Sequence, residues 1–356
     1  MANLLPLILS TLNAPLSTPM KVTVGIPCFN AARWIAQAIQ SALDQRDVET
    51  EVIVVDDGST DGSVAIAQSF GERVKVIAGG HQGANHARNL ALQNATGEWL
   101  QFLDADDCLE PAKISTQLRE AGKASKENGG HDADVIYSPV WVETWSADSS
   151  TRIASESSPE ADIFTQWIRW HIPQTGGCLW RREALARIGG WKEGQPCCQE
   201  HELYLRALMA GLRFTFTPTP GAVYRIWSEE TLCRKDPLLV IRIRTALLDT
   251  LVEHLLAQKG VHPRKNREPD FTFTAGRRFR PADFIAKQHL REIGRACFEM
   301  SRTFALHDLA GAAAWHAERK ARGLIRPAGP AAPLSYRIIY ALLGFTVAEK
   351  IARRMR

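Results

Sequence analysis

The chain lacks several features that would assign it to a common class of protein. Its seven cysteines are odd in number and include no CxxC pair, so neither a disulfide framework nor a zinc site is indicated. No stretch reaches the roughly 18 apolar residues of a membrane-spanning helix, and no internal repeat is present. The 356 residues, 45% of them hydrophobic, therefore predict a globular protein with one large domain and an appendage, or two domains. Reduced thiols indicate the cytoplasm.

Negative charge is scarce at one end of the chain. Residues 261–356 contain 19 Lys and Arg against 8 Asp and Glu, whereas residues 1–260 contain 24 against 31. A basic C-terminal region of this kind favours contact with an anionic partner. At the other end, the short apolar run Leu4–Leu9 has no preceding Lys or Arg, which makes it a poor signal peptide. We expect residues 1–19 to form a poorly ordered extension.

Strand-like and helix-like patterns alternate from residue 21 onward. Strand-like runs lie at 22–26, 51–55, 74–78 and 98–103, and helix-like runs lie between them at 31–43, 63–70 and 84–95. This alternation predicts a Rossmann-type α/β domain with a mostly parallel sheet and flanking helices. We place this domain at residues 20–235. Residues 236–356 are predicted to form a helical, basic C-terminal region.

Two motifs that would define the chemistry are missing. The turn after the first strand, Pro27-Cys28-Phe29-Asn30, has no GxGxxG pattern, which argues against a dinucleotide-binding dehydrogenase. His201-Glu202 suggests a zinc protease, but the HExxH motif needs a histidine at position 205, where the chain has leucine. The chemistry must therefore lie with other residues.

A cluster of acids follows the strand-like run 98–103. Asp104, Asp106 and Asp107 place three carboxylates within four residues, where they repel one another unless a cation binds. Carboxylate oxygens suit Mg²⁺ or Mn²⁺, and ligands of open α/β sheets bind at the carboxyl ends of strands. The cluster therefore indicates a metal site, with an acidic helix N-terminus before Pro111 as the alternative.

A pair of acids also follows the buried strand-like run 51–55. Asp57, in Asp56-Asp57-Gly58-Ser59-Thr60-Asp61, is suited to accept hydrogen bonds from a nucleobase or a ribose hydroxyl. A turn stabilised by its own aspartate side chains, with no ligand, is the other interpretation.

Four sequence segments occur in an order that is typical of one enzyme family. They are Thr23-Val24-Gly25-Ile26-Pro27-Cys28-Phe29-Asn30, Val54-Val55-Asp56-Asp57-Gly58-Ser59-Thr60-Asp61, Ala87-Arg88-Asn89 and Phe102-Leu103-Asp104-Ala105-Asp106-Asp107. Together they resemble the successive motifs of family 2 glycosyltransferases, which are inverting enzymes with the GT-A fold. The resemblance covers about residues 20–230. It implies transfer of a sugar from a nucleoside-diphosphate sugar to a hydroxyl of a saccharide or lipid-linked acceptor, in polysaccharide or glycolipid assembly at the cell envelope.

The resemblance also implies roles for the donor site. Pro27 and Phe29 would line the nucleotide pocket, and Asp57 would bind the base or the ribose. Arg88 would approach the base or the diphosphate, the alternative being an ion pair on a helix surface. Asp104 and Asp106 match the DxD motif, in which Asp106 and Asp104 hold a divalent cation, Mn²⁺ or Mg²⁺, and Asp104 also contacts the donor.

The second half of the site is implied at Gln199-Glu200-His201-Glu202-Leu203. Glu200 falls at the position of the catalytic base, although family members more often have Asp there, preceded by Glu rather than Gln199. Glu202 is the second choice and a weak acceptor contact. Trp191, in a Gly-Gly-aromatic segment, would stack against an acceptor sugar, or be a core residue in a turn.

The C-terminal segment and two rival functions remain open at this point. The apolar segment 334–345, followed by Lys350 and Arg353-Arg354, fits either peripheral contact with an anionic membrane or a helix docked on the protein. Nucleic-acid binding is not expected, because no reading motif accompanies the basic residues. A sugar nucleotidyltransferase would need a glycine-rich phosphate loop, which is missing. A non-catalytic nucleotide-sugar-binding relative is favoured only by the unusual Gln199-Glu200 pair.

Overall fold

The computed structural model describes residues 19–127, 132–145, 150–155, 162–227, 236–259 and 286–355, together with short strand segments at 272–273 and 277–278. The predicted N-terminal extension lies almost wholly outside the described residues. The chain divides into two compact units. We call Met1–Pro159 with Ile172–Glu229 the sheet unit, and Glu160–His171 with Glu230–Arg356 the helical unit.

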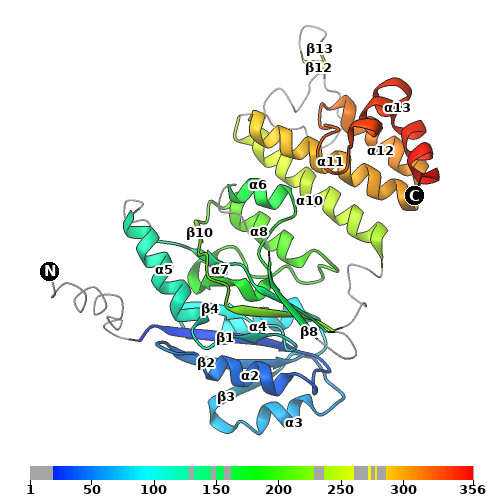
Figure 1. Cartoon of the computed structure of the whole chain (residues 1–356). Helices are drawn as coiled ribbons and strands as arrows, with labels where there is room; N and C mark the ends of the chain where they lie inside the picture. The colour runs from blue at the N-terminus through cyan, green and yellow to red at the C-terminus, as the bar shows by residue number, and fades with distance from the viewer. Residues whose placement is uncertain are drawn as a thin grey trace, which may run out of the picture. The chain divides into compact units, whose positions relative to one another are not determined.

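The sheet unit is built on a seven-stranded sheet with the strand order β10-β6-β9-β4-β1-β2-β3 (Figure 1). Its strands are β1 (Lys21–Cys28), β2 (Glu49–Asp56), β3 (Val74–Ala78), β4 (Trp99–Phe102), β6 (Val135–Tyr137), β9 (Cys178–Arg181) and β10 (Phe214–Phe216). The pairs β1–β2, β2–β3, β1–β4 and β6–β10 are parallel, and only β9 runs against its neighbours. The predicted α/β fold with a mostly parallel sheet is therefore confirmed.

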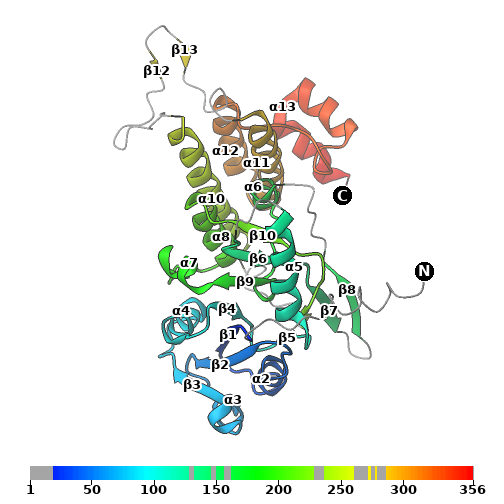
Figure 2. The same cartoon turned by 90° about the vertical axis from the view of Figure 1, so that its left-hand side faces the viewer.

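Helices cover the two faces of this sheet. The helices and turns of the unit are α2 (Ile35–Leu43), α3 (Ser63–Gln68), η1 (Gly71–Arg73), α4 (Ala84–Asn94), α5 (Lys113–Glu127), η2 (Thr175–Gly177), α7 (Arg182–Arg187) and α8 (Gln199–Met209). Figure 2 shows α4 on one side of β1 and β2, and α2 on the other.

The alternation of side chains along β1 explains how both faces are packed. Val24 and Ile26 join Ile35 and Ile39 of α2 in the main apolar core, because alternate residues of a strand point to the same face. Gly25 points to the opposite face, where a Cβ atom would come within 2.8 Å of the Ala91 Cβ of α4. A side chain at position 25 would therefore push α4 away from the sheet.

A second sheet brings a late segment of the chain beside the acid cluster. It has the order β5-β11-β7-β8 and contains β5 (Cys108–Leu109), β7 (Trp141–Trp145), β8 (Ser150–Ala154) and β11 (Ala222–Ile226). β11 runs antiparallel to β5, with Val223 opposite Cys108. Because β5 begins directly after Asp107, this pairing carries residues 224–227 toward the three aspartates.

The helical unit confirms the predicted helical C-terminal region. It contains α6 (Ile163–Ile168), α10 (Pro237–Ala257), α11 (Lys287–His307), α12 (Leu309–Ala321), α13 (Leu334–Arg354) and the short strands β12 (Thr272–Phe273) and β13 (Arg277–Arg278). None of the described helices is both long and apolar enough to cross a bilayer. The sequence did not indicate that α6, from the middle of the chain, belongs to this unit.

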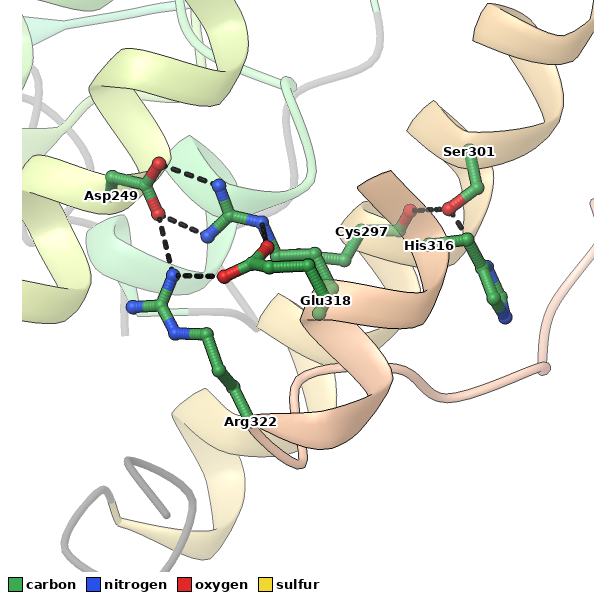
Figure 3. Close-up of polar contacts among 7 residues, drawn as sticks. Asp249, Cys297, Ser301, His316, Glu318 and Arg322 are labelled. Atoms are coloured by element: carbon green, nitrogen blue, oxygen red, sulfur yellow. Dashed lines mark hydrogen bonds and ion pairs between the residues drawn. The ribbon is translucent and has the colours of Figure 1, made fainter. Parts of the chain in front are cut away.

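Polar side chains that are buried or partly buried link the helices of this unit, as Figure 3 shows. Asp249 of α10 accepts hydrogen bonds from the guanidinium of Arg319 on α12, one of them at 2.6 Å, and lies 3.5 Å from Arg322. The Ser301 hydroxyl of α11 lies 3.0 Å from Nδ1 of His316 on α12 and donates to the Cys297 carbonyl of its own helix at 2.8 Å. The pair Asp249–Arg319 thus links α10 to α12, and the bond from Ser301 to His316 links α11 to α12.

Candidate functional site

The first two strand-end loops of the sheet unit are bonded to each other. The backbone N–H of Asn30 donates to the Ser59 hydroxyl at 2.9 Å, and the Asn30 side-chain oxygen accepts from the backbone N–H of Thr60 at 2.8 Å. The backbone N–H of Ala31 donates to the Ser63 hydroxyl at 2.8 Å. These bonds explain why the two loops carry short polar residues, and they fix the relative positions of Phe29 and Asp57.

Asp57 lies at the end of β2 and anchors the loop that leads into α4. Its two carboxylate oxygens accept from the backbone N–H groups of Gln82 at 2.7 Å and Gly83 at 2.8 Å. Nδ1 of His81 lies 3.0 Å from the Asp57 carbonyl oxygen. The side chain is only 6% exposed, although a carboxylate oxygen can accept more than one hydrogen bond. Asp57 therefore has a structural role beside the binding role expected of it.

Phe29 and Pro27 occupy different depths at the end of β1. Pro27 is buried in the strand, paired with Val55 of β2. Phe29 is 50% exposed, and its ring centroid lies 5.3 Å from that of His81. Of the two residues expected at the nucleotide pocket, only Phe29 offers an open aromatic surface.

Arg88 connects three parts of the predicted site. It projects from α4 and is 4% exposed, so it is not an ion pair on a helix surface. Its guanidinium donates to Asp104 at 2.7 Å and to the Gln199 side-chain oxygen at 3.2 Å, and it lies 4.5 Å from the centre of the Trp191 ring. One buried cation thus brings the acid cluster next to the first residue of α8.

The carboxylates of Asp106 and Asp107 carry charge that their surroundings only partly balance. Asp106 accepts from the indole N–H of Trp227 at 2.8 Å, and Asp107 accepts from the backbone N–H of Arg225 at 2.9 Å. Burial raises the pKa of both carboxyl groups, and the charge of Asp104 raises each pKa further. Such a site favours an added positive charge.

The donor set suits a divalent cation that takes part of its coordination from a ligand. The part of the chain that the structure describes holds no group of three or more His, Cys, Asp or Glu side chains arranged to bind a metal. Arg88 occupies one oxygen of Asp104, and Trp227 occupies one oxygen of Asp106. Mg²⁺ commonly binds through one or two carboxylates plus substrate phosphates and water. The carboxylate pair and its excess charge fit that pattern.

Glu200 lies in the first turn of α8, and a turn from elsewhere in the chain orients its side chain. The Thr175 hydroxyl donates to Glu200 Oε1 at 2.8 Å. The pKa of the Tyr224 phenol is raised to about 12 by burial, with further contributions from Asp107, Asp104, Asp106 and Glu200. Tyr224 of β11 is thus within electrostatic reach of both the acid cluster and Glu200.

The turn that carries Thr175 is itself fixed by buried glutamines. The side-chain amide of Gln101 donates to the Gly176 carbonyl at 3.1 Å, and that of Gln117 donates to the Gly177 carbonyl at 2.9 Å. Lys113 donates to the Gln101 side-chain oxygen, and its burial lowers its pKa to about 7. Sequence reasoning missed Thr175, because a lone threonine 25 residues before Glu200 belongs to no motif.

Glu202 forms an ion pair with an arginine, whereas the described partner of Glu200 is a neutral hydroxyl. Both of its oxygens accept from the Arg206 guanidinium at 2.8 Å. Arg206 also donates to the carbonyls of Ile188 at 2.6 Å and Gly190 at 2.7 Å. The Glu202–Arg206 pair therefore ties α8 to the Gly-Gly turn, and we do not take Glu202 further as a base or an acceptor contact.

Trp191 is a core residue of that turn. It is 2% exposed, its ring packs edge-on against Phe102 at 5.4 Å, and the Arg88 guanidinium covers it. Its backbone N–H and carbonyl both bond to the Asn89 side chain at 2.8 Å. Because the Trp191 ring presents no open face, our proposal does not include stacking of an acceptor sugar on it.

Comparison with known proteins identifies the segment that carries the donor-side residues Phe29, Asp57, Arg88, Asp104 and Asp106. Residues 23–189 match Glycosyl transferase family 2. An uncharacterized glycosyltransferase of Nostoc sp. is 32% identical over 174 residues, which are 48% of this chain and 53% of that protein. The succinoglycan biosynthesis protein ExoO of Rhizobium meliloti is 35% identical over 117 residues, 32% of this chain and 34% of that protein. The chain thus spans about half or less of the lengths of these relatives.

A solved structure shares the fold. S. aureus TarS, residues 1–349, crystallised in complex with UDP-GlcNAc, aligns with a TM-score of 0.54 at 18% identity. The alignment covers 95% of this chain and 93% of that one. At this level of identity the similarity shows the fold alone.

Proposed function

Since residues 23–189 belong to glycosyl transferase family 2, we propose that the protein transfers a sugar from a nucleoside-diphosphate sugar to an acceptor hydroxyl, with inversion at the anomeric carbon. The observation that carries the proposal is the position of Arg88, which bonds both to Asp104 and to Gln199. The donor-side carboxylates and the helix that begins with Gln199-Glu200 therefore share one site.

In this proposal the donor lies along the carboxyl ends of β1, β2 and β4. The exposed ring of Phe29 stacks on the nucleobase, and Asp57 holds the loop 79–83 beneath it while it accepts from the base or the ribose. TarS, which shares the fold, was crystallised with UDP-GlcNAc, and this supports a nucleotide-sugar donor. Arg88 acts mainly by orienting Asp104, because it is buried and already bonded to that carboxylate.

Asp104 and Asp106 would hold a divalent cation, Mn²⁺ or Mg²⁺, together with the donor diphosphate. When bound, such an ion balances the negative charge that develops on the leaving diphosphate. Trp227 positions Asp106 through its indole N–H. Asp107 is almost fully buried and bonded to the backbone of Arg225, so its proposed role is to hold β11 beside the cluster rather than to bind the ion directly.

Glu200 is the proposed general base. Its carboxylate accepts the proton of the acceptor hydroxyl while the acceptor oxygen bonds to the anomeric carbon of the sugar. The bond from that carbon to the diphosphate oxygen breaks, and its electron pair leaves with the nucleoside diphosphate. Attack and departure occur on opposite faces, which inverts the configuration. Thr175 keeps the Glu200 carboxylate oriented through its hydroxyl.

The acceptor is proposed to be a saccharide or a lipid-linked saccharide of polysaccharide assembly. The support is the similarity to a protein named for succinoglycan biosynthesis. The unusual Gln199 does not require loss of activity. Its side-chain oxygen accepts from Arg88, and its amide donates to the Gln195 carbonyl at 3.1 Å. A neutral amide can serve there because Asp104 already balances the Arg88 charge.

The test is nucleoside diphosphate release from a panel of UDP-, GDP- and dTDP-sugars, with Mn²⁺ or EDTA, for the wild type and Asp106→Asn. We expect release from one donor that EDTA stops and that the variant lacks. Release of pyrophosphate from a nucleoside triphosphate and a sugar phosphate would support a nucleotidyltransferase instead. Metal-dependent donor binding without turnover, with a range of saccharide acceptors present, would support a non-catalytic protein.

A further inference from the structure

We infer that the outward face of α13 is a docking surface for an anionic lipid bilayer. This surface, which we call the outer face, consists of Leu334, Ile338, Ala341, Leu342, Leu343 and Val347, with the cations Arg337, Lys350, Arg353 and Arg354. It lies wholly within the helical unit. The inference is independent of the sugar-transfer reaction.

The first half of α13 is apolar on two opposite sides. Its inner side carries Tyr336, which is 5% exposed and packs in a cluster with Phe298, Ile339 and Tyr340. Its outer side carries Leu334, Ile338 and Leu342, which are 65%, 52% and 76% exposed. Residues at this four-residue spacing share one face of a helix. A helix with apolar residues on both sides is expected to be covered on both sides.

A bend in the helix gathers more apolar side chains. Gly344 has φ 77° and ψ 175°, so it interrupts the helical backbone, and no atom lies within 4 Å of where its Cβ would be. Leu343, just before the bend, is 55% exposed, and Val347, just after it, is 40% exposed. The positive φ requires glycine, so an open, glycine-dependent bend sits at the centre of the apolar surface.

The charges of the segment divide cleanly between its two sides. Glu349, its only acid, is fully buried and bonded to the guanidinium of Arg302 at 2.5 Å and the hydroxyl of Tyr336 at 2.6 Å. Lys350, Arg353 and Arg354 are exposed. All the ionised groups that the described part of α13 presents outward are therefore positive.

The combination of exposed apolar residues and cations on the outer face indicates what kind of partner covers it. Apolar residues flanked by cations let a helix lie in the interface of a bilayer, with its apolar side about 5–10 Å deep and its cations at anionic headgroups. A symmetric dimer through the same face would bring the cations of two copies together, which is unfavourable. Charge complementarity therefore favours an anionic bilayer over a second copy of the chain.

The test is co-sedimentation of the full chain with vesicles of phosphatidylcholine, either alone or with about 30 mol% phosphatidylglycerol, where each cation near the surface adds about fivefold to binding. We expect binding to the anionic vesicles only, and weaker binding as salt rises from about 0.1 to about 0.5 M. Absence of wild-type binding, or equal binding to both vesicles, would overturn the inference.

Two sets of variants locate the surface. Ile338→Ser with Leu342→Ser is expected to lower the partition coefficient by about tenfold or more, whereas Leu306→Ser, at a residue of α11 that is 47% exposed, changes it by less than about twofold. Arg353→Gln with Arg354→Gln is expected to lower it by about 25-fold. The matched control, Arg73→Gln with Arg187→Gln at exposed positions of the sheet unit, leaves it unchanged.

Circular dichroism confirms folding of each variant. If the double apolar variant does not fold, Leu342→Ser alone provides the same comparison. Wild-type levels of vesicle binding by a folded outer-face variant would contradict the inference. So would a wild-type dimer that the outer-face variant converts to a monomer without any vesicle binding, because a second copy would then be the partner.

Discussion

Acidic side chains in the two units of the protein have opposite surroundings. In the helical unit the fully buried Glu349 pairs with Arg302, and the partly buried Asp249 pairs with Arg319. In the sheet unit Asp106 and Asp107 lie together at a strand end, and burial and the charge of Asp104 raise the pKa of both. Paired charges link the helices of the helical unit, whereas the acid cluster of the sheet unit has the excess negative charge for which we propose a bound cation.

The same contrast exists within a single helix turn. Glu202 is bonded through both oxygens to Arg206, but Glu200 has only the neutral hydroxyl of Thr175. A carboxylate without a cation keeps its ability to accept a proton. The pairing of a carboxylate, rather than its position in the sequence, is therefore the better guide to its role.

The largest effect on activity is expected from substitution of Glu200, the acid of this helix turn that has no cation bonded to it. Glu200→Gln removes the proposed base and should lower kcat by about 10²–10⁴-fold, with little change in stability. Glu202→Gln is the matched control at the other acid of the same helix turn. It should leave kcat within about fivefold of the wild-type value and lower the unfolding free energy by about 1–3 kcal/mol. Steady-state kinetics with the donor found in the panel measures both. Equal loss of kcat in the two variants would contradict our assignment.

The second prediction compares one carboxylate from each unit. Asp249→Asn leaves Arg319, which is 5% exposed, with Glu318 as its remaining charged partner, and should lower the unfolding free energy by about 1–3 kcal/mol. Asp106→Asn removes repulsion in metal-free protein and should raise that free energy by up to about 1 kcal/mol. Amide hydrogen exchange resolves the two units. Destabilisation by Asp106→Asn comparable to that by Asp249→Asn would remove the distinction between them.

The third prediction concerns pH, and it applies to the helical unit alone. Burial, with Lys320 nearby, lowers the pKa of His316 to about 4. The unfolded chain therefore binds a proton at a higher pH, near 6.5, than the folded one. Stability contributed by neutral His316 is full above about pH 6.5 and is lost as pH falls toward 4, amounting to roughly 2 kcal/mol.

Hydrogen exchange in α11 and α12 between about pH 7 and pH 4.5 measures this loss. His316→Phe keeps an aromatic ring beside Phe345, which His316 stacks against at 4.2 Å, and should flatten the pH dependence. A slope unchanged in that variant would show that other groups cause it.

The smallest expected effect tests the turn that orients Glu200. Thr175→Val keeps the shape of the side chain but removes the hydroxyl bonded to Glu200, and should lower kcat about tenfold with KM nearly constant. The pH profile of kcat should also move, because a hydrogen bond to the carboxylate is lost. Thr175→Ser should restore both. A uniform loss of activity in Thr175→Ser as well would indicate a merely structural role.

Local patterns in the sequence predicted much of the sheet unit. The expected runs 22–26, 51–55 and 74–78 fall within β1, β2 and β3, and the expected helix 84–95 nearly matches α4. Alternating and helical periodicities are set by residues close in sequence, which is why these elements were predictable. The predicted family is also borne out by the match over residues 23–189.

Contacts between distant residues could not be predicted in this way. Trp227 donates to Asp106 across 121 positions of the chain, and Thr175 reaches Glu200 because Gln101 and Gln117 fix its turn. These contacts follow from the pairing of β11 with β5 and from the pairing of β4, which carries Gln101, with β9. Likewise, the sequence left open whether Trp191 contacts an acceptor sugar or is a core residue, and only the structure shows that the Arg88 side chain from α4 covers it.

The central claim is that the excess charge of the acid cluster serves a metal-bound donor while Glu200 serves the chemical step. The most direct measurement is calorimetric binding of the nucleoside diphosphate, with and without Mn²⁺, to the wild type, Asp106→Asn and Glu200→Gln. We predict Mn²⁺-dependent binding to the wild type and Glu200→Gln with similar affinity, and loss of at least about tenfold in affinity in Asp106→Asn. Mn²⁺-independent binding, or equal affinity in Asp106→Asn, would contradict the claim.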